Sequence, residues 1–258
     1  MTGDRATGTG VEEPRPVVAV FRPADERLDE AVALLEDLGV EPLADPMLAV
    51  EPTGATPRSD AEFTVFTSKT GAELVAAAGW QAPGQTSVCA IGDTTATALE
   101  SAGYPVDEVP AEFSSQGLVD HLGDAVAGSR VEVARSDHGS DVLLDGLEAA
   151  GAYVHETVLY RLVRPPEAGD SVAAAAAGDL DAALFTSSLT VEHFLDLAAE
   201  RGEAEAVRAG LDAAVIGAIG APTSETAAAA GLEVEVVPKT ADFEALATEV
   251  VAALRAHE

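Results

Sequence analysis

The sequence predicts an α/β protein in which two similar domains each have a parallel sheet covered by helices on both faces. An apolar run that leads through Ile-Gly and a threonine into an Ala-rich segment occurs twice, at 88–97 and 215–224. The other signals recur in the same order, at offsets of 113 (18 to 131), 112 (38 to 150) and 119 (66 to 185) residues, and the two Ile-Gly units are 128 residues apart (91 to 219). Alternating strands and helices with right-handed crossovers form such sheets, and the repeat indicates an internal duplication.

The elements of the first half follow from short local patterns. The apolar run at 17–21 predicts a buried strand, and apolar residues at helical spacing predict a helix over 25–38 that ends at Gly39. Prolines interrupt an extended segment at 41–50, and the turn-rich stretch at 52–57 indicates a linker. A strand at 63–66 then leads into a helix that ends at Gly79.

The first Ile-Gly unit predicts a strand, a helix ending at Gly103 and a short strand at 106–110. Serines then precede a helix that runs through Leu122. We expect a strand at 131–134, a helix from Asp141 to Gly151 and a long extended segment at 153–163.

Pro165 and Pro166 mark a second linker. The remaining elements repeat the pattern of the first half, from a strand–helix pair through the second Ile-Gly unit to a closing strand and a C-terminal helix. We expect them at 171–177 (helix), 182–185 (strand), 188–199 (helix), 215–219 (strand), 223–231 (helix), 234–238 (strand) and 242–255 (helix).

The composition limits the partners and the location of the protein. The net charge is −31, and scattered carboxylates with no basic stripe argue against a nucleic-acid partner and indicate a salt-adapted protein. No apolar run is long enough to cross a membrane. Residues 1–14 do not resemble a signal peptide, and we expect a disordered tail there. One cysteine, Cys89, cannot form an internal disulfide, which favours a cytoplasmic location.

Several common kinds of site have no sequence support. The five histidines form no close pair, and no Cys-x-x-Cys is present, so no metal site is expected. No Gly-x-Gly-x-x-Gly motif for a dinucleotide and no Gly-x-Ser-x-Gly motif of a serine hydrolase occurs. By contrast, each Ile-Gly unit places free backbone amides at the start of a helix, where an anion can bind.

Several short motifs occur in an order that resembles the uroporphyrinogen-III synthase family, from about residue 17 to the end. The shared motifs are Phe-Arg-Pro at 21–23, Phe-Thr-Ser at 66–68 and 185–187, Ile-Gly-x-x-Thr at 91–95, Phe-Ser-Ser-Gln-Gly-Leu at 113–118, Gly-Ala-x-Val…Tyr-Arg at 151–161 and Ile-Gly-Ala-Pro-Thr at 219–223. Each motif is weak alone, and the combination on a duplicated chain is what is specific.

The residues alone leave two arrangements open, with the two repeats either consecutive or with exchanged N-terminal units. The resemblance implies the exchange, with domain 1 at 15–51 plus 165–258, domain 2 at 52–164 and two extended connectors. It also implies a substrate cleft between domains, a monomer, and no metal or organic cofactor. The implied reaction is the closure of hydroxymethylbilane, with inversion of its last pyrrole ring through a spiro intermediate, to uroporphyrinogen III.

The substrate carries eight carboxylates, which hydroxyls and amides at helix starts can bind. The hydroxyl candidates are Thr67, Ser68, Thr95, Ser114, Ser115, Thr186, Ser187, Ser188 and Thr223. Each of them could equally be a helix cap without substrate contact. The resemblance also assigns Tyr160 as the catalytic residue, whose phenol would assist loss of the substrate hydroxyl. The alternative for Tyr160 is a strand tyrosine that packs the connector.

Arg22 and Arg135 follow matching strands and are candidates for binding substrate carboxylates, or else for neutralising nearby acidic residues. The loop after Arg135 lacks a second arginine often found there in the family. In the second Ile-Gly unit Pro222 replaces Thr94, so Thr223 corresponds to Thr95.

Other functions stay open on the sequence. A non-catalytic regulatory or binding module could hold an anionic small molecule between the same two domains. A sugar- or amino-acid-binding protein that closes on its ligand is a further alternative, against which the missing signal peptide argues.

Overall fold

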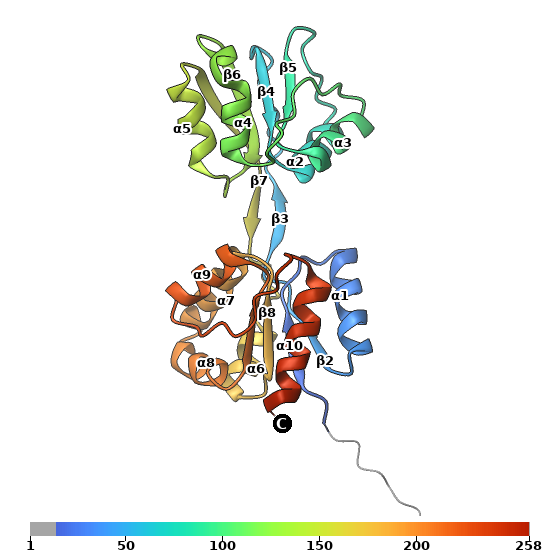
Figure 1. Cartoon of the computed structure of the whole chain (residues 1–258), viewed down its shortest axis with the longest axis vertical. Coiled ribbons are helices and arrows are strands. Elements are labelled where there is room, and N and C mark those ends of the chain that lie inside the picture. The colour runs from blue at the N-terminus through green and yellow to red at the C-terminus, as the bar shows by residue number, and fades with distance from the viewer. Residues whose placement is uncertain (1–13, 258) are drawn as a thin grey trace, which may run out of the picture. The chain divides into compact units, whose positions relative to one another are not determined.

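The computed structural model describes residues 14–257 and divides them into two compact units (Figure 1). Unit 1 comprises 14–49 and 164–257, and unit 2 comprises 50–163. The chain enters unit 2 within strand β3 (Ala49–Pro52) and leaves it at the end of strand β7 (Tyr153–Val163). Of the predicted tail at 1–14, all but residue 14 lies outside the described residues.

Unit 1 contains a four-stranded parallel sheet in the order β2-β1-β8-β9. The strands are β1 (Val17–Val20), β2 (Glu41–Ala44), β8 (Ala182–Phe185) and β9 (Val215–Ala218). Strands β8 and β9 are buried along their whole length, as expected for a parallel sheet covered on both faces.

Two layers of helices cover this sheet, because alternate strand residues point to opposite faces. Helices α1 (Glu26–Asp37) and α10 (Phe243–His257) pack on the face of Val18 and Val20. The opposite face, with Ala19 and Phe21, is covered by α6 (Asp170–Ala177), α7 (Ser188–Glu200), α8 (Ala204–Leu211) and α9 (Ala221–Ala229).

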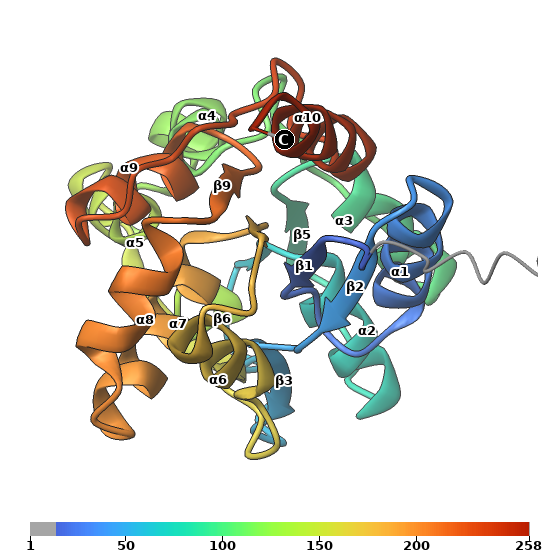
Figure 2. The same ribbon diagram turned by 90° about the horizontal axis from the view of Figure 1, so that it is seen from below.

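Helix α8 has no counterpart in the sequence prediction. It packs beside α6 (Figure 2), and its Gly210 is the point of close approach. A Cβ atom at Gly210 would lie 1.9 Å from the carbonyl oxygen of Ala175 on α6. Glycine is therefore required by the tight helix crossing, although it lowers the helix propensity on which a sequence prediction depends.

Unit 2 contains a five-stranded sheet in the order β3-β7-β6-β4-β5. Its further strands are β4 (Phe63–Phe66), β5 (Ser87–Ala90) and β6 (Arg130–Ser136), and the pairs β4–β5, β4–β6 and β6–β7 are parallel. One face is covered by α2 (Lys69–Ala77) and α3 (Asp93–Ser101). The other is covered by α4 (Ser115–Leu122), the 3₁₀ turn η1 (Gly123–Val126) and α5 (Asp141–Ala149).

The two sheets share one strand order when strands are matched by their sequence motifs. The order β2-β1-β8-β9 in unit 1 corresponds to β7-β6-β4-β5 in unit 2. Unit 1 takes β1 and β2 from the first half of the chain and β8 and β9 from the second. This order is the one expected from a duplicated unit whose N-terminal parts have exchanged, which stays a prediction.

Two predicted elements are much shorter than expected. The segments at 106–110 and 234–238 form single bridges, Cys89–Glu108 and Gly217–Val236, rather than strands. Each ends at a proline, which has no amide hydrogen for a ladder. The extended segment predicted at 41–50 also divides, into β2 and the start of β3.

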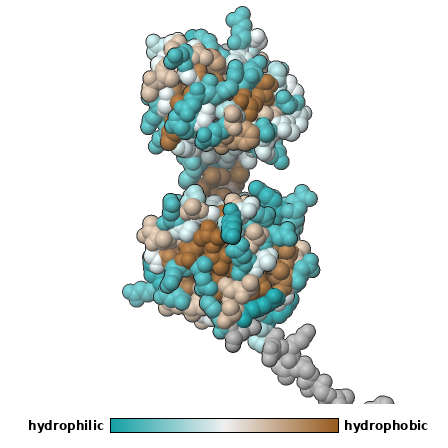
Figure 3. Space-filling view, viewed as in Figure 1, coloured by the Kyte–Doolittle hydropathy of each residue, from teal (hydrophilic) through white to brown (hydrophobic). Residues whose placement is uncertain are grey.

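The surface agrees with the acidic composition. On the face shown in Figure 3, hydrophilic residues cover much of each unit and hydrophobic patches lie between them. Within residues 14–257, no helix combines the length and apolar composition that a membrane span needs.

Candidate functional site

In unit 2, Tyr160 and Ser68 meet where strand β4 leads into helix α2. The Ser68 side chain caps α2 by accepting a hydrogen bond from the amide of Gly71 at 3.0 Å. The Tyr160 hydroxyl donates to the same Ser68 oxygen at 2.9 Å, and Tyr160 is only 6% exposed. The structure thus brings together the predicted catalytic residue and one predicted binding residue. Thr67, between β4 and Ser68, is half-buried.

The next strand of the sheet leads into a helix start without a side-chain cap. Helix α3 follows the N-cap residue Gly92, which has no side chain to bond the first amides. Thr95, in the first turn of α3, is 4% exposed. Because β4 and β5 are parallel neighbours, this helix start lies at the same edge of the sheet as Ser68.

Helix α4 is capped more completely. The Ser114 side chain accepts from the amide of Gly117 at 2.9 Å and donates to the Glu112 carboxylate at 2.9 Å. The predicted cap at Ser114 is therefore present, whereas Ser115 is the first residue of the helix and is half-buried.

Unit 1 repeats the same two kinds of helix start. Ser187 caps α7 by accepting from the amide of Thr190 at 3.3 Å, and Ser188 donates to the carbonyl of Pro222 at 3.1 Å. Helix α9 begins at Gly220 without a side-chain cap. Thr223, in the first turn of α9, is 4% exposed, like Thr95 in α3. Thr186, before the cap of α7, is half-buried.

The two candidate arginines have different surroundings. Arg135 is 4% exposed, and its guanidinium donates to Glu156 at 2.5 Å and to the carbonyl of Ser140 at 2.6 Å. These contacts hold the loop after β6. Arg22 is half-buried, with its guanidinium 4.7 Å from the centre of the Phe243 ring. Partial burial lowers the pKa of Arg22, and acidic residues on α1 and at the start of α10 face it.

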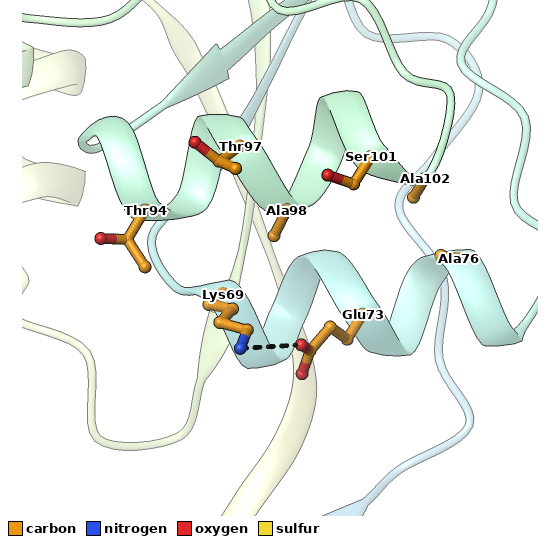
Figure 4. Close-up of a pocket in the computed structure, with 8 residues that line it drawn as sticks. All are labelled: Lys69, Glu73, Ala76, Thr94, Thr97, Ala98, Ser101 and Ala102. Carbon is orange, nitrogen blue, oxygen red and sulfur yellow. Dashed lines mark ion pairs between the residues drawn. The ribbon is translucent and has the colours of Figure 1, made fainter.

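A groove of about 670 Å³ lies between α2 and α3 (Figure 4). Its lining includes Lys69 and Thr94, the chain neighbours of the candidate residues Ser68 and Thr95. The other lining residues are Glu73, Ala76, Thr97, Ala98, Ser101 and Ala102. Lys69 is paired with Glu73 at 3.4 Å. Neither Lys69 nor Thr94 is among the site residues predicted from the sequence. A usable signal existed, since Lys69 is one of only two lysines in the chain.

Cys89 lies within β5, is 0% exposed, and burial raises its thiol pKa to about 12. We expect no reaction of the folded protein with iodoacetamide at pH 8, because almost no thiolate is present and the sulfur is covered. Mass spectrometry of the protein with and without urea measures this difference. Labelling of the folded protein as fast as that of the unfolded chain would contradict it.

Among the described residues, no group of three or more His, Cys, Asp or Glu residues could hold a metal ion.

Comparison of the chain with known proteins points to one family. The family model described as uroporphyrinogen-III synthase HemD matches residues 29–248. A protein of Methanothermobacter thermautotrophicus, provisionally named uroporphyrinogen-III synthase, is 32% identical over 199 residues, which cover 71% of this chain and 78% of that protein. The uroporphyrinogen-III synthase of Synechococcus elongatus is 32% identical over 114 residues, 43% of each chain. The fold is similar to a crystal structure of a mutant uroporphyrinogen III synthase from Thermus thermophilus, with a TM-score of 0.65, 21% identity and coverage of 94% of this chain and 100% of that one.

Proposed function

Since the chain belongs to the uroporphyrinogen-III synthase family, we propose that it converts hydroxymethylbilane to uroporphyrinogen III and water. The bond between the terminal methylene carbon and its hydroxyl breaks, and the hydroxyl leaves as water after gaining a proton. The resulting cation is attacked by the substituted carbon of the last pyrrole, which gives the spiro intermediate. The original methylene bond to the spiro carbon then breaks, and that methylene bonds to the other α carbon of the same pyrrole, which inverts the ring. Loss of the hydrogen on that carbon returns the proton that was used to form water.

The paired uncapped helix starts are the observation that supports this function best. Helices α3 and α9 both begin at a glycine, and each has a nearly buried threonine in its first turn, Thr95 or Thr223. Their hydroxyls and free amides suit carboxylates, although in α9 Pro222 supplies no amide hydrogen. The partial positive charge of a helix N-terminus favours an anion. We assign Thr95 and Thr223 to substrate binding. We propose the same role for the other hydroxyl candidates, at the same edge of their sheets.

Ser68, Ser114 and Ser187 combine this position with a capping role, because each cap lies at the carboxyl edge of its sheet. Arg22 is a weaker candidate for substrate contact, since acidic residues already surround it. Arg135 contributes by holding the loop after β6, because its guanidinium is already hydrogen-bonded inside unit 2.

Tyr160 is assigned the proton donation that assists loss of the substrate hydroxyl. In the structure the Tyr160 hydroxyl donates to Ser68. Rotation about the phenol C–O bond would redirect this proton to the substrate without moving the buried ring. The substrate ionises readily, and a modest acid is therefore sufficient. The enzyme's larger task is to hold the substrate in the geometry that inverts the ring.

Three further parts of the proposal concern the salt concentration, the oligomeric state and the domains. The protein acts in a salt-rich cytoplasm as a monomer, where screening within about 3 Å at 1 M salt removes most repulsion between a chain of charge −31 and an anionic substrate. Local amides and hydroxyls then supply the binding. The two compact units are proposed as the two functional domains.

The isomer ratio of the product tests this function. We expect mainly isomer III from hydroxymethylbilane in about 1 M KCl, a salt concentration at which screening is strong, because unassisted closure gives isomer I. Chromatography of the oxidised porphyrins measures the ratio, and circular dichroism shows that the protein is folded. Formation of isomer I alone by the folded protein would contradict the proposal and favour a binding module.

A further inference from the structure

Phe113 is an aromatic side chain held rigidly in an exposed position. It is 58% exposed, whereas Phe21, Phe66, Phe185 and Phe194 are fully buried. The turn beneath it is fixed by a hydrogen bond from the amide of Ser114 to the carbonyl of Glu112 at 2.8 Å and by the Ser114 cap of α4. Gly117 allows the chain to fold back closely on this turn, because a Cβ atom at this position would lie 2.1 Å from the carbonyl oxygen of Glu112.

The ring of Phe113 packs on the backbone of Gly92, the N-cap residue of α3. A Cβ atom at Gly92 would lie 2.9 Å from Cγ of Phe113. Gly92 has φ −178°, an extended conformation open to any residue, so its backbone does not require glycine. The space that Phe113 occupies requires it. The sequence thus places an exposed aromatic ring beside the uncapped start of α3 and keeps room for it.

An exposed aromatic ring beside an uncapped helix start suits one ring of the proposed substrate. Each pyrrole of hydroxymethylbilane is a flat aromatic ring with two carboxylates. We propose that Phe113 is a positioning residue that packs against one pyrrole ring, while a carboxylate of that ring binds the amides at the start of α3 and the Thr95 hydroxyl. This inference rests on the proposed function and adds the contact that orients the ring.

Stacked aromatic rings attract each other, and covering the exposed ring of Phe113 removes apolar surface from water. The carboxylate and the ring are recognised by neighbouring groups on one rigid edge of unit 2. A contact of this kind acts on ground-state and transition-state binding alike, and its loss therefore raises KM more than it lowers kcat.

Steady-state kinetics of Phe113 variants test the inference. We expect Phe113→Ala to raise KM about tenfold, as loss of one stacked and buried ring implies, with kcat within about threefold of wild type. Phe113→Tyr keeps the ring and restores KM, whereas Phe113→Leu keeps only the apolar volume and restores it in part. Gly92→Ala raises KM as well, because the added methyl group displaces the ring.

Tyr153→Ala is the matched control. Tyr153 is 71% exposed and pairs with the first residue of β6, at the amino ends of the strands. Its removal leaves KM unchanged, and thermal unfolding shows whether each variant is folded. An unchanged KM in a folded Phe113→Ala variant that still makes isomer III overturns this inference alone. Formation of only isomer I by the wild type overturns the proposed function and the inference together.

Discussion

Replacing Tyr160 by phenylalanine is expected to lower kcat about 100-fold and to leave isomer III as the main product. The factor is at the low end for general acid catalysis, because the hydroxyl of the substrate leaves readily. The ring itself stays in place, since it is 6% exposed and packs in the core beneath α2 and α3. Initial rates and the isomer ratio, measured together in about 1 M KCl where screening is strong, check the expectation.

Ser68→Ala separates the chemistry of Tyr160 from its hydrogen bond. This change removes the acceptor of the Tyr160 proton and the cap of α2, and we expect a loss of about 1 kcal/mol in unfolding free energy. The Tyr160 phenol is then free to donate to substrate, so kcat falls less than in Tyr160→Phe.

Equal kcat in Tyr160→Phe and wild type would leave Tyr160 a packing residue of β7. A shift to isomer I would instead assign it to ring inversion.

Sequence reasoning succeeded where structure depends on a few adjacent residues. The caps at Ser68, Ser114 and Ser187 could be predicted because a serine oxygen and the amide three residues later are brought together by the helix itself. The parallel sheets followed from the alternation of apolar runs and helical patterns. The glycine turns before α3 and α9 were found in the same way.

The contacts that connect distant segments could not be predicted from local patterns. Tyr160 and Ser68 are 92 residues apart, and only the pairing of the strands in unit 2 brings them together. For Arg135 the sequence left open substrate contact or neutralisation of nearby acidic residues, and only the fold brings Glu156 on the neighbouring strand and the carbonyl of Ser140 to its guanidinium. The packing of Phe113 on Gly92 likewise depends on two separate loops.

Asp45→Ala is expected to give the largest loss of stability, about 3–5 kcal/mol in unfolding free energy. Asp45 is 3% exposed, and its carboxylate accepts from the amide of Gly169 at 3.0 Å, from the amide of Ser171 at 2.9 Å and from the Ser171 hydroxyl. It thus caps α6 from a segment more than 120 residues earlier in the chain. Alanine would leave these buried donors without an acceptor. Urea denaturation at constant salt, followed by circular dichroism, measures the loss.

Two variants show whether the burial of the Asp45 carboxylate or simple capping is responsible. Asp45→Asn keeps one acceptor oxygen and is expected to recover part of the loss. Asp25 caps α1 by accepting from the amide of Arg27 at 3.0 Å, but its side chain is 40% exposed. Water can replace that cap, so Asp25→Ala should cost only about 1 kcal/mol. If both alanine variants lost the same amount, Asp45 would be an ordinary cap. A much larger loss for Asp45 would mean that this carboxylate fastens the segment before β3 to the start of α6.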